Sequence, residues 1–173
     1  SFWWRGVTAK SLLTLWRHGE AGSASSDAVR ELTDRGRVEV SAMASDLSAW
    51  LDAAGLPMVA KLYTSPLIRA QQTAALFAQH GCSERPEICA ELVPEAIPEG
   101  FADSVFDDDT HVVAVTHQPF LSRAIAFWSD DATLAPLAPA GYATLQVTSL
   151  ERGGATVLRH RPDPRSARHM GFS

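Results

Sequence analysis

The sequence predicts an α/β fold, a three-layer α/β/α sandwich whose central sheet is mostly parallel and has an antiparallel edge at its C-terminal end. Residues 12–16 and 111–116 are nearly continuous apolar runs, as expected of strands buried on both faces. Helical patterns alternate with strand-like segments, which is typical of parallel sheets covered by helices. Residues 142–150 and 155–160 alternate in the strand period around a Gly-Gly turn, which indicates an antiparallel hairpin.

The first strand, residues 12–16, leads into an Arg-His-Gly turn and a small, polar loop. After this loop, Thr33 is well suited to cap a helix that ends at Gly55, and Pro57 prevents the helix from resuming. The apolar residues of this helix recur at steps of three and four and are expected to face the core: Val40, Met43, Ala44, Leu47, Trp50, Leu51 and Ala54.

Residues 60–64 form the second expected strand. Ser65 is expected to cap a helix whose first residue is Pro66 and which ends at Gly81. Its expected apolar face consists of Leu67, Ala70, Ala74, Phe77 and Ala78. Arg69 lies in the first turn and off this face, so it is a cation close to the free N–H groups of a helix start.

The second half of the chain continues the alternation. Residues 87–93 are predicted to form a short edge strand, and the prolines that follow leave room for one or two helical turns. The acidic residues 107–109 are expected in a solvated turn. After the buried strand at 111–116, Pro119 is expected to start a helix that continues to about Trp128.

Composition bounds the classes of partner. The net charge of −5 argues against a nucleic-acid binder, and no apolar run approaches the roughly 18 residues of a membrane span. Cys82 and Cys89 lack metal-ligand spacing and favour a reduced, cytoplasmic protein over a disulfide-bonded one. The expected domain covers residues 12–160. Residues 1–11 form an arm or a remnant of processing or cloning without the features of a signal peptide, and 161–173 a loosely ordered tail.

Three predicted strand ends carry side chains suited to anion chemistry. Arg17 and His18 follow the first strand, Arg69 lies just beyond the second, and His117 follows the buried strand near the middle of the sheet. Ligands of open α/β sheets bind beyond the carboxyl ends of the strands, so these groups are expected to converge there. Arginine forks match phosphate oxygens, and Gly19 allows a bound group to approach the main chain closely. Phosphate is therefore the expected ligand.

Four motifs, in this order, resemble those of the phosphoglycerate mutase-like histidine phosphatase superfamily, branch 1. They are R-H-G-E at 17–20, S-P-L-I-R-A-Q-Q-T at 65–73, A-E-L-V-P-E around Glu91 and T-H-Q-P at 116–119. The resemblance spans about residues 12–160. The short chain and its D-x-x-R-x-L-T-x-x-G stretch, residues 27–36, are most similar to SixA-type phosphohistidine phosphatases.

The resemblance implies a phosphatase that needs no metal or organic cofactor. His18 would attack phosphorus and form a phosphohistidine, which water then hydrolyses. Arg17, Arg69 and His117 would hold the phosphoryl oxygens, and phosphate or vanadate would bind in the same place. Outside this set, His80 is expected at a helix end, and His111, His160 and His169 are expected at ordinary surface or strand-end positions.

The proton donor for the leaving group stays open. Glu91 matches the family's acid position best, and Glu20 and Asp27 are alternatives. Arg30 is expected either to contact phosphate or substrate or to pair with Asp27 as a clamp of the loop. The expected phosphate- and substrate-binding set is Arg17, Gly19, Glu20, Arg30, Arg69, His117 and Gln118.

The expected pocket is shallow and open. Only nineteen residues separate Glu91 from His111, too few for a substantial lid. An open pocket admits a phosphorylated side chain on a folded protein, so phosphohistidine on a protein is the first substrate hypothesis. A small phosphoester is the second, and a phosphoprotein-binding module with little turnover is the third. Trp16 and Gln118 depart from the family's pattern and are expected to reshape the rim.

Overall fold

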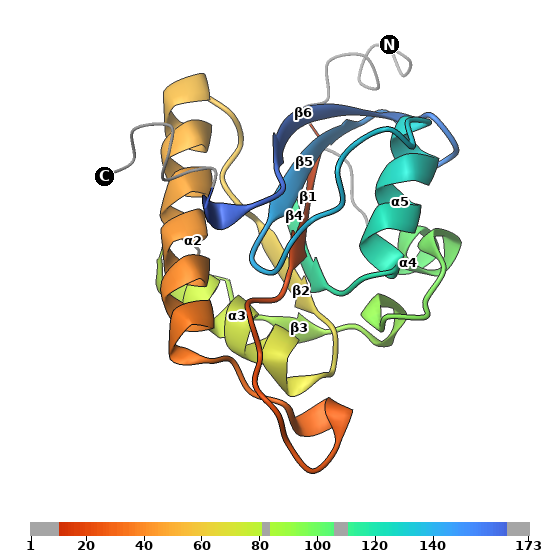
Figure 1. Cartoon of the computed structure of the whole chain (residues 1–173). Helices are drawn as coiled ribbons and strands as arrows, with labels where there is room; N and C mark the ends of the chain where they lie inside the picture. Colours follow the sequence, from red (N-terminus) through yellow and green to blue (C-terminus); the bar gives the residue numbers. More distant parts are fainter. Residues whose placement is uncertain (1–10, 81–83, 106–110, 166–173) are drawn as a thin grey trace.

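The computed structural model describes residues 11–80, 84–105 and 111–165. They form a six-stranded mixed sheet with helices on both faces, in the strand order β3-β2-β4-β1-β5-β6 (Figure 1). The strands are β1 (Leu12–Arg17), β2 (Lys61–Thr64), β3 (Glu87–Ile88), β4 (His111–Thr116), β5 (Tyr142–Val147) and β6 (Ala155–Arg161). The helices are α2 (Asp34–Ala54), α3 (Ile68–Gln79), α4 (Pro98–Val105) and α5 (Phe120–Ser129), with 3-10 turns η1 (Asp27–Val29) and η2 (Ala90–Leu92). The predicted α/β/α sandwich is confirmed.

The two faces of β1 supply two apolar layers. Leu12 and Trp16 pack with α2 and α3, whereas Leu13 and Leu15 pack with α4 and α5. This division follows from the alternation of side chains along a strand. Figure 1 shows α2 and α3 on one side of the sheet and α4 and α5 on the other. The sheet is therefore buried between two helical layers.

The centre of the sheet is parallel and its C-terminal edge is antiparallel, as predicted. β1 pairs in parallel with β4, and Arg17 lies opposite Thr116 in the register. On its other side, β1 pairs antiparallel with β5, which forms a hairpin with β6. Every residue of β4 is buried, in agreement with its apolar sequence. The register places the carboxyl ends of β1 and β4 side by side.

Both predicted ends of α2 are confirmed. The Thr33 side chain accepts a hydrogen bond from the Gly36 N–H at 2.9 Å, which is an N-cap. Gly55 ends the helix in the left-handed region, at φ 64°. Most of the predicted apolar stripe is buried, but Trp50 is half-buried and Ala54 is exposed.

The start of α3 differs from the prediction. The helix begins at Ile68 rather than Pro66, and Leu67 is its N-cap residue. Ser65 instead forms a tight local turn, in which its Oγ accepts a hydrogen bond from the Leu67 N–H at 3.1 Å. The edge strand β3 is also shorter than predicted, at two residues. The predicted stop at Gly81, the acidic turn at 107–109 and Cys82 lie outside the described residues, and Cys89 is a free, buried cysteine.

Trp16 belongs to the core, so the prediction that it shapes the rim of the pocket is wrong. Its side chain is fully buried. The indole packs edge-on against Phe77, with ring centroids 5.0 Å apart, and its N–H donates to the Ala140 carbonyl at 2.8 Å. A strand residue at this position faces the α2 and α3 layer, whereas the next residue, Arg17, faces the site.

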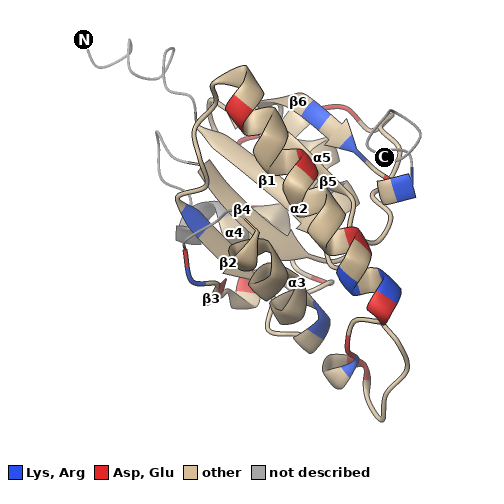
Figure 2. Cartoon of the chain, turned by 90° about the vertical axis from the view of Figure 1, so that its left-hand side faces the viewer, with Lys and Arg blue, Asp and Glu red and all other residues tan. Residues whose placement is uncertain are grey.

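A buried polar cluster joins α2 to the antiparallel edge. The Asp46 carboxylate accepts hydrogen bonds from the Tyr142 hydroxyl at 2.6 Å and from the Arg159 guanidinium at 3.1 Å. Arg161 adds a third contact with Asp46 at 3.4 Å. Figure 2 shows acidic positions on α2 close to basic positions on β6. Because each buried charge has a charged partner, the cluster ties the helix to the hairpin without leaving an isolated ion.

Candidate active site

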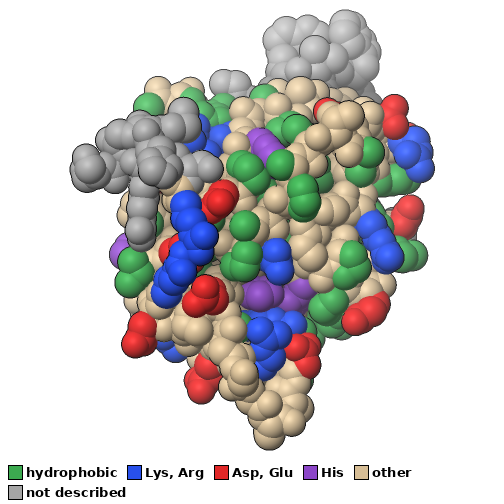
Figure 3. Space-filling view, viewed as in Figure 1, with side chains coloured by type: hydrophobic (Ala, Val, Ile, Leu, Met, Phe, Trp, Pro, Cys, Tyr) green, Lys and Arg blue, Asp and Glu red, His purple; other side chains and the backbone are tan. Residues whose placement is uncertain are grey.

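The carboxyl ends of β1 and β4 bring two histidines together. His18 follows β1 and His117 follows β4, and their ring centroids lie 4.9 Å apart. Two positively charged side chains lie at the same site. Arg17 is the last residue of β1, and Arg69 lies in the first turn of α3. Figure 3 shows histidine side chains in a hollow of the surface, with basic side chains beside them. The structure thus assembles the four residues that the sequence placed at strand ends.

His18 is held as a neutral imidazole with one free lone pair. Its Nδ1 donates to the Gly19 carbonyl at 2.7 Å, so its Nε2 carries the lone pair and accepts a hydrogen bond from Arg69 Nε at 3.3 Å. Burial, followed by the nearby charges of Arg69 and Arg17, lowers the pKa of His18 to about 4, although the bond to Gly19 opposes this. The ring is therefore unprotonated at Nε2 near pH 7.

Gly19 serves packing rather than ligand contact. A Cβ on this residue would lie 2.7 Å from a methyl group of Val40 and 3.0 Å from the Gly36 carbonyl oxygen. Its N–H donates to Thr73 Oγ1 at 3.0 Å and is therefore not free for a ligand. The expectation that Gly19 opens the main chain to a bound group is wrong, because α2 and α3 occupy that space.

Arg69 uses three of its five N–H groups inside the protein. In addition to His18, it donates from Nη1 to the Asp27 backbone carbonyl at 2.8 Å and from Nη2 to the Asp27 carboxylate at 3.1 Å. Only about 6% of the Arg69 side chain is exposed, compared with 65% of that of Asp27. The turn η1 thus reaches across to α3 and fixes the orientation of the guanidinium.

Asp27 and Arg30 pair as a clamp of the loop, which is one of the two roles that the sequence predicts for Arg30. Arg30 donates to the carbonyls of Gly22 at 2.8 Å and Ala21 at 3.3 Å, and to the Asp27 carboxylate at 3.2 Å. Hydrogen bonds from Arg30 and then Arg69 lower the pKa of Asp27. Because Asp27 is a carboxylate held by two arginines, the structure favours a positioning role over that of a proton donor.

Glu20 also stabilises the loop. Its carboxylate accepts a hydrogen bond from Thr33 Oγ1 at 2.9 Å, and its backbone carbonyl accepts from the Thr33 N–H at 2.9 Å. A Cβ on Gly36 would come within 2.2 Å of the same carbonyl oxygen. The loop after β1 is thereby pressed against the start of α2, and Glu20 is engaged in that contact.

Arg17 and Gln118 share the carbonyl of Leu137. Arg17 Nη1 donates to it at 2.9 Å, and Gln118 Nε2 donates at 3.4 Å. The carboxamide oxygen of Gln118 also accepts from the Ser122 N–H at 3.0 Å. The Nε of Arg17 is buried and has no acceptor among the described residues. Burial, followed by the charge of Arg69, lowers the pKa of Arg17.

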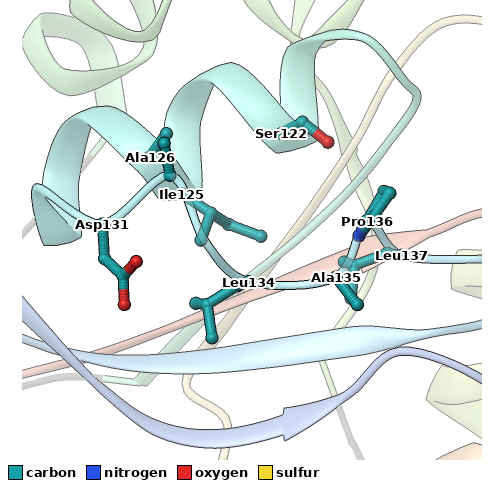
Figure 4. Close-up of a pocket in the computed structure, with 9 residues that line it drawn as sticks. Ser122, Ile125, Ala126, Asp131, Leu134, Ala135, Pro136 and Leu137 are labelled. Carbon is teal, nitrogen blue, oxygen red and sulfur yellow. The ribbon is translucent and has the colours of Figure 1, made fainter.

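Leu137 also forms one wall of a cavity of about 220 Å³ between α5 and the segment that leads to β5. The other lining residues are mostly apolar: Ser122, Ile125, Ala126, Asp131, Ala132, Leu134, Ala135 and Pro136 (Figure 4). The cavity is therefore an apolar neighbour of the site, separated from Arg17 by the backbone of Leu137.

His117 is the second buried imidazole. Its Nε2 lies 2.6 Å from Ser65 Oγ, and its Nδ1 is buried without a hydrogen-bond partner in the described part of the chain. Burial, followed by electrostatic interaction with His18 and Arg69, lowers the pKa of His117 to about 3. From the sequence, Ser65 is predicted only as a helix cap. Its place at the head of the S-P-L-I-R motif was the available signal.

Glu91 belongs to a segment anchored next to the site, but among the described residues its carboxylate has no hydrogen bond or ion pair with the four central side chains. It belongs to η2, and its carboxylate accepts a hydrogen bond from the Cys89 thiol at 3.1 Å. This bond is the main cause of the lowered pKa of Glu91. Thr116 Oγ1 donates to the Leu92 carbonyl at 2.6 Å, which anchors η2 next to the end of β4. Cys89, whose pKa burial raises to about 11, stays protonated and can keep donating.

His80 ends α3 as its C-cap residue, and His160 contacts the Ala135 carbonyl, away from the site. His111 is a strand-end residue as predicted, but it is fully buried rather than on the surface. His169 lies outside the described residues. Within the described ranges, no group of three or more His, Cys, Asp or Glu side chains is arranged to hold a metal ion. No described helix is long and apolar enough to cross a membrane.

The sequence and the fold are similar to those of phosphatases. A family model of the histidine phosphatase superfamily (branch 1) matches residues 13–93. No curated protein matches the chain. The fold is similar to that of the protein histidine phosphatase SixA in a complex with tungstate, with a TM-score of 0.72 and 22% identity over 90% of this chain and 99% of that one.

Two further structures have the same fold. A SixA protein from Nakamurella multipartitia is 25% identical, with a TM-score of 0.66 over 88% of this chain and 97% of that one. A mutant phosphoserine phosphatase from Entamoeba histolytica, in complex with phosphoserine, is 15% identical, with a TM-score of 0.59 over 87% and 96%. SixA is in a complex with tungstate, a phosphate-like oxyanion, and the phosphoserine phosphatase is in a complex with a phosphate compound.

Proposed function

We propose that this chain, a phosphatase of the histidine phosphatase superfamily (branch 1), works through a phosphohistidine intermediate on His18 and dephosphorylates phosphohistidine on proteins. One observation carries the chemistry: the lone pair on His18 Nε2 lies within a cluster of two arginines and a second neutral histidine. Such a cluster combines a nucleophile with donors for the charge of a phosphoryl group.

The geometry assigns the attacking atom. Since Nδ1 of His18 donates to a backbone carbonyl, Nε2 is the nitrogen that can attack phosphorus. A bond forms between Nε2 and phosphorus while the bond to the leaving group breaks. Water then attacks the same phosphorus, releases inorganic phosphate and restores the lone pair of His18. No external cofactor is needed for either step.

Three donors would receive the phosphoryl oxygens. The Nε–H of Arg69 can donate to a phosphoryl oxygen in place of His18 Nε2, because its hydrogen bond to His18 is long, at 3.3 Å. The Nε–H of Arg17 and a ring N–H of His117 have no protein acceptor in the described ranges and would bind oxygens without first breaking a bond. Fixed donors that await the developing charge are the main source of catalysis in phosphoryl transfer.

The open pocket that the sequence predicts would suit a protein substrate. In the described part of the segment between Glu91 and His111, the structure has one α-helix, α4, of eight residues. This helix packs beside α5, on the side of the sheet opposite α2 and α3. The similarity to SixA, described as a protein histidine phosphatase, points to the same substrate class. The cytoplasmic location expected from the cysteines stays a prediction.

We retain Glu91 as the proposed proton donor. Its segment is anchored beside His117, whereas Glu20 and Asp27 are both engaged in holding the loop after β1. Replacing Glu91 with Gln should slow hydrolysis of esters with poor leaving groups much more than that of an activated aryl phosphate, which needs no proton. Glu20→Gln is the matched control, and equal losses on both ester types would remove Glu91 from this role.

The decisive experiment compares wild type and His18→Ala on a phosphohistidine protein and a panel of small phosphoesters, with chelator present. We expect preference for the phosphoprotein and loss of turnover in the variant. Wild type denatured in alkali during turnover should retain phosphate on His18, because phosphohistidine is labile in acid and stable in alkali. Preference for a small ester would keep the chemistry and favour a phosphomonoesterase, in line with the phosphoserine phosphatase fold. Tight binding without His18-dependent turnover would indicate a phosphoprotein-binding module.

A further inference from the structure

The side chain of Ser65 links the start of α3 to His117. Ser65 is fully buried, and its Oγ has two contacts among the described residues: the Leu67 N–H at 3.1 Å and His117 Nε2 at 2.6 Å. The N–H of Leu67 can only donate, so the oxygen accepts there. The hydroxyl proton is left over, and of the two described partners of this oxygen, Nε2 of His117 is the one that can accept it. This direction of hydrogen bonding places the ring proton of a neutral His117 on Nδ1.

We propose that Ser65 is a positioning residue, which fixes His117 as the Nδ1–H tautomer and so makes this histidine a hydrogen-bond donor to the phosphoryl group. The proposal rests on the proposed function, because it assigns the partner of Nδ1 to a phosphoryl oxygen. It accounts for the buried Nδ1 atom of His117, which has no acceptor in the described part of the chain. A buried donor without a partner is costly unless a ligand completes it.

The two histidines then have the same tautomer and opposite tasks. His18 donates its Nδ1–H to the Gly19 carbonyl, which leaves the lone pair of Nε2 available for attack. His117 accepts a hydrogen bond from the Ser65 hydroxyl at Nε2, which leaves its Nδ1–H available to donate. A backbone carbonyl and a serine hydroxyl thus decide which ring is the nucleophile and which is the donor. The lowered pKa values of both rings, about 4 and about 3, agree with this neutral pair.

The opposite tautomer would harm the reaction. With its proton on Nε2, His117 would present a lone pair where a phosphoryl oxygen has to bind, and the two lone pairs would repel each other. Without Ser65, no group in the described chain selects between the tautomers. We therefore expect the loss of this hydroxyl to act on the transition state through His117 and to leave the binding contributions of Arg17 and Arg69 in place.

The direct test is nitrogen NMR of the full-length protein labelled with ¹⁵N at its histidines, at pH 7 without substrate. Long-range couplings distinguish a protonated ring nitrogen from an unprotonated one. We expect the His117 ring to show a protonated Nδ1 and an unprotonated Nε2. A protonated Nε2 in the wild type would overturn the proposal. This NMR measurement needs no turnover, so its result does not depend on whether the proposed phosphatase reaction is found.

Variants give the catalytic test. Ser65→Ala should populate both His117 tautomers and lower kcat about tenfold or more, with little change in KM or in tungstate affinity. Ser65→Thr retains a hydroxyl and should restore both the tautomer and most of the rate. Ser45→Ala, on the exposed side of α2, is the matched control for loss of a serine hydroxyl. Wild-type tautomer and wild-type kcat in Ser65→Ala would refute the proposal.

Discussion

Arg69 donates a hydrogen bond from Nε to Nε2 of His18 across 3.3 Å. The lone pair proposed to attack phosphorus is thus covered, in the unliganded protein, by the guanidinium proposed to receive the phosphoryl oxygens. A phosphoryl group that takes this N–H for itself also releases the lone pair. Binding of the substrate and exposure of the nucleophile are therefore coupled through one hydrogen bond.

Replacing Arg69 with Ala should weaken binding of tungstate or vanadate by at least about tenfold. A hydrogen bond to a charged group contributes roughly 1.5–3 kcal/mol, and the Asp27 carboxylate left behind would repel an oxyanion. Calorimetric titration with the oxyanion measures the change. Arg30→Ala should have a smaller effect, because Arg30 contacts the loop, and Arg37→Ala on exposed α2 should have none. Unchanged affinity in Arg69→Ala would exclude it from the site.

The ring of His18 should titrate far below the usual range of histidine. Its pKa is lowered to about 4 by burial and by neighbouring arginines, so the neutral, nucleophilic form persists as the pH falls to about 5. Below about pH 4 the ring gains a proton and loses its lone pair. NMR titration of the His18 ring in the unliganded protein checks this value without interference from substrate ionisation. A midpoint near 6.5 would contradict the description of the site.

His111 should make folding stability depend on pH. Its Nδ1 is 3.0 Å from the Pro57 carbonyl and its Nε2 2.7 Å from Thr14 Oγ1, and burial lowers its pKa to about 4. The unfolded chain binds this proton near pH 6.5 while the folded chain does not, so stability falls as the pH drops from about 6.5 to about 4 and changes no further below that. The loss amounts to about 3 kcal/mol.

Denaturant titrations of wild type and His111→Gln at several pH values measure the effect. The variant should be less stable than wild type at pH 7, because it loses a buried hydrogen-bonding ring. Its stability should nevertheless fall less steeply between pH 6.5 and 4. Parallel pH dependence in the two proteins would mean that His111 does not contribute to acid unfolding.

Gly36→Ala should destabilise the protein even though it lies in a helix. Alanine normally favours a helix over glycine by about 1 kcal/mol. Here the new Cβ would lie 2.2 Å from the Glu20 carbonyl oxygen, and an overpacked contact of this kind costs typically 1–3 kcal/mol. We expect a lower Tm and lower activity, since the shifted loop carries the residues after His18. Gly22→Ala, whose nearest contact would be 3.8 Å away, is the control and should leave Tm unchanged.

The sequence was informative where local patterns determine structure. The apolar runs before His18 and His117 predict buried strands, and parallel strands end at one edge of a sheet, so both histidines could be placed together. Thr33 and Gly55 are cap residues whose effect is local and therefore predictable. The fold class and the four central site residues follow from such patterns together with the family resemblance.

Contacts between distant segments could not be read in the same way. The orientation of Arg69 depends on Asp27, which is 42 residues away in the sequence. The burial of Trp16 depends on which face of β1 meets α2 and α3, and a fully apolar strand does not mark its faces. Ser65 has the properties of a helix cap, and only the packed structure shows its hydroxyl on His117.

The internal partners of Arg69 also bear on how the reaction ends. When inorganic phosphate dissociates, the Arg69 guanidinium can again donate to His18, and it keeps both contacts with Asp27. The hydrogen bond that Arg69 loses when the product departs is therefore replaced by one within the protein, to His18, and not by water alone. This arrangement favours weak inhibition by the product and rapid turnover when phosphate is abundant.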